Sequence, residues 1–401
     1  MGLARTTRCC SAVALTLAIA ANAEFAAAPS PPKALPFFPT RAVWSLTLNN
    51  PLTQSPAYDA TRAFFPIAGD RLVAYDLKTG TLAWTVAAAP TMALTAGDNL
   101  IFFPEKDELV ALRTADGARA WHVRLDEPLG VSPVWDNGWL VLATARGTVI
   151  AMSARDGRVI WRRDIGTPLH ARPALSADRV YVPLSNTHVA ALAVETGNSI
   201  WDKRLGGDPN DILALDDRIY VGSKDRYLYC IDAARGTVEW RSMRTGADVV
   251  GVPTSDDDRV YFVSLDNILR AVSRGSGVQQ WMRPLPFRPS SGPIRAGATI
   301  IAAGPMPSLP TFNAKDGTPV GTLPTVPEPA APPHLVIDSA SGLPLLVILT
   351  GDIAKGVTVS LLTRGIDPAP APVGTLPGAI TTLPTVSSPA APSGLPEPRQ
   401  D

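Results

Sequence analysis

Six polar residues stand at neighbouring positions ahead of β-rich runs in successive segments of the chain. They carry an imidazole, a guanidinium, a carboxylate, two amides and a hydroxyl, and they are Gln54, His170, Arg172, Asn210, Asp211 and Ser290. If the fold gathers them around one opening, charges of both signs and several hydrogen-bonding groups converge there, as binding of a polar ligand or an extended peptide requires. These six residues are therefore candidates for a binding site that lines a channel. The simpler interpretation is that they only line a solvent-filled channel.

Catalytic motifs are missing from the sequence. It has no Gly-x-Ser-x-Gly elbow, no His-Glu-x-x-His pair and no phosphate-binding loop. Aspartate-rich stretches such as Asp256-Asp-Asp258 fit solvated turns better than metal ligands. Lysine plus arginine and aspartate plus glutamate both number 36, so the formal net charge is zero. This balance gives no electrostatic basis for binding nucleic acid, and the sequence predicts neither an enzyme nor a nucleic-acid-binding protein.

A repeat of 37 to 41 residues organises the chain and must position the six polar side chains. In six copies a glycine follows the first residue of a turn by four positions and a tryptophan follows it by eight, as in Asp76-Leu-Lys-Thr-Gly80-Thr-Leu-Ala-Trp84. The six tryptophans are Trp84, Trp121, Trp161, Trp201, Trp240 and Trp281. A seventh copy keeps Gly317 but has Gly321 where the tryptophan would stand. Such a period indicates a repeat architecture in which each unit packs against its neighbours.

Each repeat has the features of four β-strands. Its glycine lies between two apolar runs and supplies the positive φ of a hairpin turn. Two runs rich in β-branched and aromatic residues precede the turn, as in Asp178-Arg-Val-Tyr-Val182 and Leu228-Tyr-Cys-Ile231. A weaker strand, often marked by a proline, precedes those runs. Four antiparallel strands per repeat form one blade of a β-propeller, with the tryptophan on the outermost strand packed between blades.

The two ends of the repeat region predict how the ring closes. Trp44 has the spacing of an outermost strand but no turn before it, whereas strands at 334–338, 343–350 and 357–363 are followed by alternating prolines that cannot extend a sheet. We predict an all-β, eight-bladed propeller over residues 41–365 whose last blade is completed by the N-terminal strand; seven blades are the alternative. Because Gly321 replaces a tryptophan, we expect a weaker blade interface there.

The phrase Asp-x-x-Thr-Gly-x-x-x-Trp, preceded by runs such as Leu72-Val-Ala-Tyr-Asp76, resembles the pyrroloquinoline-quinone-type repeat over residues 41–365. The resemblance implies two kinds of relative. Quinoprotein dehydrogenases oxidise alcohols or sugars with the quinone and calcium, whereas non-catalytic propellers, such as an outer-membrane assembly lipoprotein of Gram-negative bacteria, hold partners by their loops. The alcohol-oxidising members place an adjacent cysteine pair beside the cofactor, and the only such pair here is Cys9-Cys10. We therefore expect no cofactor, with pyrroloquinoline quinone and calcium as the alternative.

Residues 1–23 have the features of a secretory signal peptide. A basic region precedes the apolar run 11–21, and Ala21-Asn22-Ala23 fits cleavage after Ala23. The run is short for a bilayer, so we expect no transmembrane helix in the mature chain; a retained anchor is the alternative. Cys9 and Cys10 precede the run, so no lipoprotein cysteine follows the signal.

Proline-rich segments mark the remaining boundaries. We predict a linker at 24–40, a loop between the last two blades at 322–333 and a disordered tail at 366–401. The predicted protein is a monomeric, periplasmic or secreted propeller that binds a protein or peptide as a non-catalytic scaffold. The alternative is a propeller that binds a quinone or another small molecule and acts as an oxidoreductase.

Overall fold

A computed structural model describes residues 37–365, apart from 177, 327, 339–340 and 353–355. The predicted signal peptide at 1–23, the predicted linker at 24–40 except for its last four residues, and the predicted tail at 366–401 lie outside the described residues. All regular secondary structure of the described part is β-strand. In this part of the chain, no helix has the length and apolar character needed to cross a membrane.

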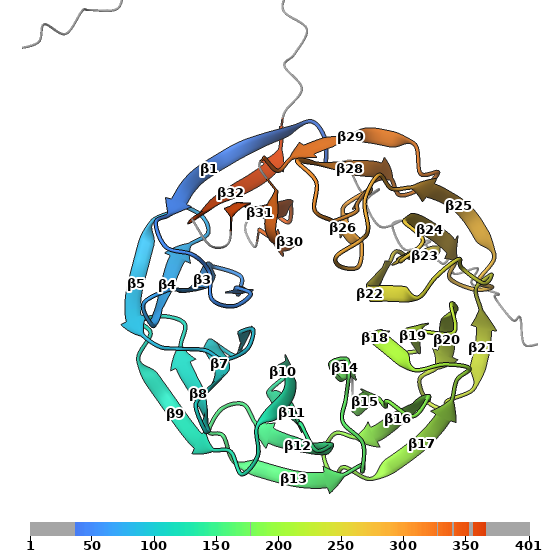
Figure 1. Cartoon of the computed structure of the whole chain (residues 1–401), viewed down its shortest axis with the longest axis horizontal. Helices are drawn as coiled ribbons and strands as arrows, with labels where there is room; N and C mark the ends of the chain where they lie inside the picture. The colour runs from blue at the N-terminus through green and yellow to red at the C-terminus, as the bar shows by residue number, and fades with distance from the viewer. Residues whose placement is uncertain (1–36, 177, 327, 339–340, 353–355, 366–401) are drawn as a thin grey trace, which may run out of the picture.

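Eight four-stranded antiparallel sheets are arranged as a ring, which confirms the eight-bladed propeller (Figure 1). We number the blades in chain order. The innermost strands are β2 (Ala57–Tyr58), β6 (Thr95–Gly97), β10 (Leu129–Asp136), β14 (Ala174–Ser176), β18 (Pro209–Ala214), β22 (Val249–Ser255), β26 (Ile294–Ala296) and β30 (Pro329–Ile337). The second strands are β3 (Arg62–Ile67), β7 (Leu100–Glu105), β11 (Trp139–Thr144), β15 (Arg179–Pro183), β19 (Arg218–Ser223), β23 (Arg259–Ser264), β27 (Thr299–Ile301) and β31 (Pro344–Asp352).

The outer half of each blade follows the same order. The third strands are β4 (Arg71–Asp76), β8 (Glu108–Arg113), β12 (Thr148–Ser153), β16 (His188–Ala193), β20 (Leu228–Asp232), β24 (Ile268–Ser273), β28 (Ser308–Asn313) and β32 (Gly356–Arg364). The outermost strands are β5 (Leu82–Ala87), β9 (Arg119–Arg124), β13 (Val159–Asp164), β17 (Ser199–Arg204), β21 (Val238–Arg241), β25 (Gln279–Pro284), β29 (Pro319–Pro324) and β1 (Thr40–Leu48).

The eighth blade joins the two ends of the repeat region. Strand β1 pairs with β32 from Thr40 opposite Arg364 to Leu48 opposite Val357, so the N-terminal strand completes the last blade as predicted. The predicted loop at 322–333 is wrong over most of its length, because residues 322–324 end β29 and residues 329–333 begin β30. Prolines are tolerated there because β29 is an edge strand and β30 begins at the inner edge of its sheet.

The second and third strands of each blade are buried on both faces, because each sheet is covered by a neighbouring sheet on either side. Ala63, Phe64 and Phe65 of β3 are all fully buried, and they project alternately into two hydrophobic clusters, one shared with blade 8 and one with blade 2. This is why these runs are continuously apolar rather than alternating in sequence.

Tryptophans of the outermost strands fasten seven of the eight interfaces. In each, the indole Nε1 donates to a carbonyl oxygen of the next blade, at 2.6 Å for Trp161 and Val194. The pairs are Trp44–Leu77, Trp84–Thr114, Trp121–Ala154, Trp161–Val194, Trp201–Ala233, Trp240–Arg274 and Trp281–Ala314. The ring lies against the turn glycine of that blade: a Cβ on Gly197 would lie 2.7 Å from Trp161, and its φ is +70°. The turn glycine is therefore required both for its backbone conformation and for contact with the indole.

The interface between blades 7 and 8 is fastened differently. Phe38 occupies the space beside Gly321, where a Cβ would lie 2.9 Å from its ring. Phe37 is fully buried in a cluster shared by blades 6, 7 and 8, and its backbone N–H donates to Thr299 Oγ1 at 3.0 Å. The segment that precedes β1 thus fills the space left by the missing tryptophan.

Candidate functional site

The ladder registers identify eight equivalent positions around the central axis. In each blade, one residue of the innermost strand lies at the same level of the hydrogen-bonded ladder as the tryptophan position of the outermost strand. The equivalent position is two residues before that innermost-strand residue. The eight residues are Ser55, Ala93, Ser132, Arg172, Asp211, Val252, Gly292 and Pro332. Among these eight, Arg172 and Asp211 are charged, and they belong to the adjacent blades 4 and 5. This ring of positions is therefore polar on one side and mostly small or apolar on the other.

Three cavities lie along the inner wall, and two of them include residues of this level. One of about 450 Å³ is lined by Ser55, Ser132 and Arg172, and one of about 300 Å³ by Arg172 and Asp211. The third, of about 540 Å³, lies towards the end where the innermost strands turn into the second strands. Arg172 is common to the first two cavities, and Tyr58 and His334 are common to the first and the third, so the three cavities adjoin one another along the inner wall.

Of the six residues predicted from the sequence, the structure places Arg172 and Asp211 beside one cavity. The side chain of Arg172 is exposed, and that of Asp211 is half-buried. Burial raises the pKa of the Asp211 carboxyl, and the positive charge of Arg172 partly opposes this rise. No ion pair within 4 Å joins Asp211 to any residue of the described chain. Both charged groups are therefore available to a bound molecule.

The other four predicted residues do not join this pair. Gln54 and Asn210 use their amide groups between blades, where Gln54 Nε2 donates to Thr91 O at 3.2 Å and Asn210 Nδ2 donates to Val249 O at 2.6 Å. His170 and Ser290 are exposed and lie in bends, outside the innermost strands. Strand β14 begins only at Ala174, because the segment before it crosses from the outer edge of blade 3.

Sequence reasoning missed an aromatic pair at the channel. Tyr58 of β2 stacks on His334 of β30, with ring centroids 4.1 Å apart and planes 10° apart. Both line the cavities of about 450 and 540 Å³. Loss of hydration among the surrounding strands lowers the pKa of His334 to about 4, although its side chain faces the channel. The only sequence signal was that His334 begins the predicted strand 334–338.

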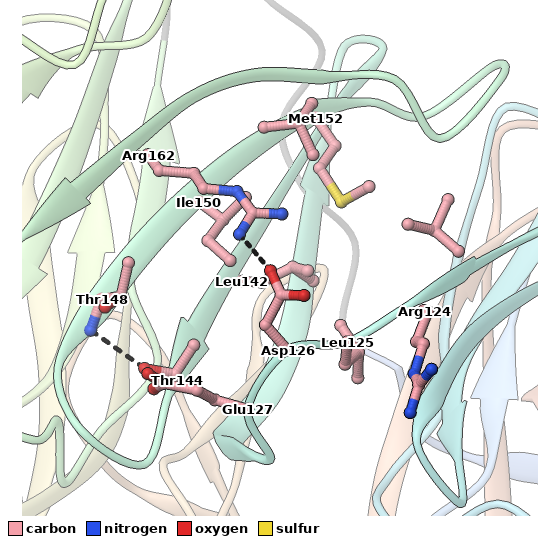
Figure 2. Close-up of a pocket in the computed structure, with 12 residues that line it drawn as sticks. Arg124, Leu125, Asp126, Glu127, Leu142, Thr144, Thr148, Ile150, Met152 and Arg162 are labelled. Atoms are coloured by element: carbon pink, nitrogen blue, oxygen red, sulfur yellow. Dashed lines mark hydrogen bonds and ion pairs between the residues drawn. The ribbon is translucent and has the colours of Figure 1, made fainter.

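A small apolar cavity lies away from the channel, between blades 2 and 3. Figure 2 shows Leu142, Ile150 and Met152 on its walls and Arg162 facing Asp126 across it, with Nη1 and Oδ2 2.5 Å apart. Its volume is about 60 Å³. The walls belong to the hydrophobic packing between the blades, so we interpret the cavity as an imperfection of that packing and not as a functional site.

Metal-ligand and thiol side chains of the described residues are dispersed or buried. None of their His, Cys, Asp and Glu side chains form a group of three or more that could hold a metal ion. Cys230 is fully buried, and this burial raises the pKa of its thiol to about 12. The thiolate needed for nucleophilic attack is therefore disfavoured.

Comparison with known proteins places this geometry among repeat propellers. The profile of the family described as outer membrane protein assembly factor BamB matches residues 39–132, 105–213 and 188–331. A search of curated proteins finds no match.

Solved structures share the fold at low sequence identity. BamB from Moraxella catarrhalis is 20% identical, with a TM-score of 0.63 over 80% of this chain and 97% of that one. Quinohemoprotein alcohol dehydrogenase ADHIIG from Pseudomonas putida is 14% identical, with a TM-score of 0.61 over 85% and 79%. Quinohemoprotein alcohol dehydrogenase from Comamonas testosteroni is 13% identical, with a TM-score of 0.62 over 84% of this chain and 78% of that one. At these identities the likeness concerns the fold.

Proposed function

The chain belongs to the family of the outer membrane protein assembly factor BamB, and from that premise we propose that it is a non-catalytic scaffold that binds a protein or peptide partner outside the cytoplasm. The observation that carries the proposal is the channel wall, where Arg172 and Asp211 face one cavity without an ion pair between them. In the described residues the thiol of Cys230 is buried, and no group of three or more His, Cys, Asp or Glu side chains that could hold a metal ion accompanies the pair.

An extended peptide is the partner that suits this wall. Charged groups on blades 4 and 5 face a ring whose other positions include Val252, which is 40% exposed, and the exposed Pro332. A peptide in extended conformation presents alternate side chains to opposite sides, so one strand would meet the charged and the apolar sides together. The features of a signal peptide at residues 1–23 support a location outside the cytoplasm.

Site-directed photo-cross-linking in intact cells tests the scaffold. A photoreactive amino acid at Val252 faces the channel, and the matched control at Val278 stands at the outer rim, where that valine is 60% exposed. We expect a discrete protein adduct at position 252 and none at 278. Adducts of equal yield at both positions, or none at 252, would overturn the proposal.

A cofactor titration tests the non-catalytic part. We propose that the mature protein does not bind pyrroloquinoline quinone and calcium, because the described carboxylates do not converge as hard oxygen ligands must. Absorbance and thermal unfolding are followed together during the titration. Saturable quinone binding with a raised melting temperature would contradict this and would require a screen of alcohols and sugars as substrates.

A further inference from the structure

The outermost strand of blade 5 ends earlier than its counterparts. In blade 3 the outermost strand continues from Trp161 to Asp164, and those of blades 1, 2, 4 and 6 likewise extend three residues beyond their tryptophans. Strand β21 instead ends at Arg241, one residue after Trp240. A departure from an otherwise regular repeat is a place where a functional role is expected.

Hydrogen bonds hold the segment that follows β21, residues 242–246, against the turn between β19 and β20. The buried Ser242 hydroxyl accepts the backbone N–H of Leu228 at 3.0 Å. The buried Thr245 hydroxyl donates to Arg226 O, also at 3.0 Å. The two residues between these anchors are thereby held at the surface.

Those two residues are Met243 and Arg244. Met243 is 69% exposed, and the side chain of Arg244 is exposed as well. A single exposed hydrophobic residue is common on a protein surface. This methionine, however, stands in a segment that buried hydroxyl groups fix in place, and it lies among arginines.

Three exposed arginines, Arg226, Arg241 and Arg244, come from the two segments that these hydrogen bonds join. In the described chain no carboxylate oxygen lies within 4 Å of their side-chain nitrogens. The guanidinium carbon of Arg241 lies 4.6 Å from the centre of the Tyr227 ring. This stacking holds one of the three charges in position before any ligand is bound.

Two carboxylates of the adjoining turns have partners elsewhere. Asp225 Oδ2 accepts the hydroxyl of Tyr229 at 2.5 Å. Asp266 of blade 6 accepts the backbone N–H of Gly246 at 2.8 Å and forms an ion pair with Arg270 at 2.7 Å. The charges of the three arginines are therefore available to an anionic ligand.

We propose that the blade-5 rim binds an acidic segment of a protein partner, with an apolar residue among its carboxylates. The rim comprises Arg226, Tyr227, Arg241, Met243 and Arg244. Guanidinium groups pair with carboxylates through two parallel hydrogen bonds, and the flexible methionine covers the apolar residue. Arginine, tyrosine and methionine are also enriched where protein interfaces form. That the carboxylates belong to a protein rests on the proposed scaffold function, whereas their recognition rests on the rim.

A flat anionic surface such as a bilayer suits the rim less well. The formal net charge of the chain is zero, and the end of the ring that carries the rim also carries the exposed Asp164 at the end of β13. A plane would therefore meet charges of both signs, whereas a short acidic segment contacts the arginines alone.

Calorimetric titration of the full mature chain tests the rim. The probes are acetyl-Glu-Glu-Leu-Glu-Glu-amide, the same peptide with glutamine in place of glutamate, and phosphatidylcholine vesicles that contain phosphatidylglycerol. We expect the acidic peptide to bind, its binding to weaken as the salt concentration rises, and the glutamine peptide not to bind. Equal binding of the two peptides would overturn the proposal. Binding of the vesicles without binding of the acidic peptide would overturn the protein segment as the occupant.

Substitutions that remove one positive charge separate the rim from the general field. Arg244→Gln should weaken binding of the acidic peptide by about tenfold or more. Arg155→Gln, at an exposed arginine in the turn between β12 and β13, should leave binding unchanged. Arg241→Lys keeps the charge but loses the planar stacking group, so it should weaken binding by a smaller factor. Equal weakening by Arg244→Gln and Arg155→Gln would show that the rim is not the site.

The rim and the channel can fail separately. If the acidic peptide does not bind while the adduct at position 252 still forms, the rim is wrong and the scaffold function stands. If the peptide binds, Arg244→Gln weakens it and no adduct forms at position 252, the proposed scaffold function of the channel fails and recognition of carboxylates by the rim stands.

Discussion

Seven blade interfaces and the eighth differ in how the chain fastens them. At the seven, the indole of a tryptophan donates to a carbonyl oxygen 30 to 34 residues further along the chain. At the interface of blades 7 and 8, Phe37 donates its backbone N–H to Thr299, 262 residues away, and Phe38 lies beside Gly321. Six interfaces can therefore form between consecutive repeats, whereas the two that blade 8 makes with blades 7 and 1 require both ends of the ring.

This difference locates the weak point of the ring. A repeat interface is stabilised by its neighbours on either side, and loss of one tryptophan leaves the adjoining interfaces in place. The interface of blades 7 and 8 depends on a segment that also leads into β1, the strand that completes blade 8. Damage to this segment should therefore affect the pairing of β1 as well as one interface.

The largest expected effect comes from Phe37→Ala. The phenylalanine is fully buried in the cluster shared by blades 6, 7 and 8, so its truncation should cost towards the upper end of about 3–5 kcal/mol in the free energy of unfolding. Urea unfolding measures the loss, and hydrogen exchange should show faster exchange in β1 and β32. Unchanged exchange in these strands would show that the segment does not secure the closure.

Trp161→Ala provides the matching change at a repeat interface. The tryptophan is 9% exposed and donates to Val194 O, and its loss should cost about 3 kcal/mol. Hydrogen exchange should rise in blades 3 and 4 while β1 keeps its protection. Faster exchange of β1 in this variant would contradict the division between seven equivalent interfaces and one distinct interface.

A smaller effect should come from the glycine against which a tryptophan packs. Gly157 and Gly166 have φ angles of +71° and +72°, but a Cβ on Gly157 would lie 2.7 Å from Trp121, whereas a Cβ on Gly166 would meet nothing within 4 Å. Alanine at Gly166 should cost only the backbone strain of about 1 kcal/mol, and alanine at Gly157 about 2 kcal/mol or more because the indole must also move. Equal losses in thermal unfolding would mean that the ring contact contributes nothing.

The same comparison explains how much of the structure the sequence predicts. The blades, their number and the tryptophan contacts follow from residues that recur at fixed spacing, because every copy is under the same packing constraint. Phe37 and Phe38 stand outside the repeat, so no spacing marked them, and the missing tryptophan at Gly321 predicted a weaker interface without showing what fills it. Whether that interface is weaker stays a prediction, which hydrogen exchange in blades 6 and 7 tests.

The candidate site was less predictable for a related physical reason. Innermost strands such as β10 and β30 contain register shifts, at Val131–Val134 and Ala331–His334, so an offset counted along the sequence does not fix which side chain faces the axis. Strand β14 has no register shift, whereas β18 has one between Pro209 and Ile212, so Asp211 lies beside the cavity despite an irregular ladder. Tyr58 and Trp135 lie on the inner wall because of the way in which β2 and β10 pair with the second strands of their blades.

The smallest effect concerns pH and the interface of blades 8 and 1, where His334 stacks on Tyr58 at the channel side of the interface. The folded-state pKa of His334 is lowered to about 4, whereas an unfolded histidine has a pKa of about 6.5. As the pH falls through that interval, the unfolded chain takes up a proton that the folded chain does not. The free energy of unfolding therefore decreases, and the stack of His334 on Tyr58 is destabilised.

His334→Gln should reduce this loss of stability between pH 6.5 and 4. His170→Gln, which changes an exposed histidine in a bend, is the control. The effect should remain small because water in the channel reaches the His334 ring, and an unchanged pH dependence in His334→Gln would show that the stack is not the group that titrates.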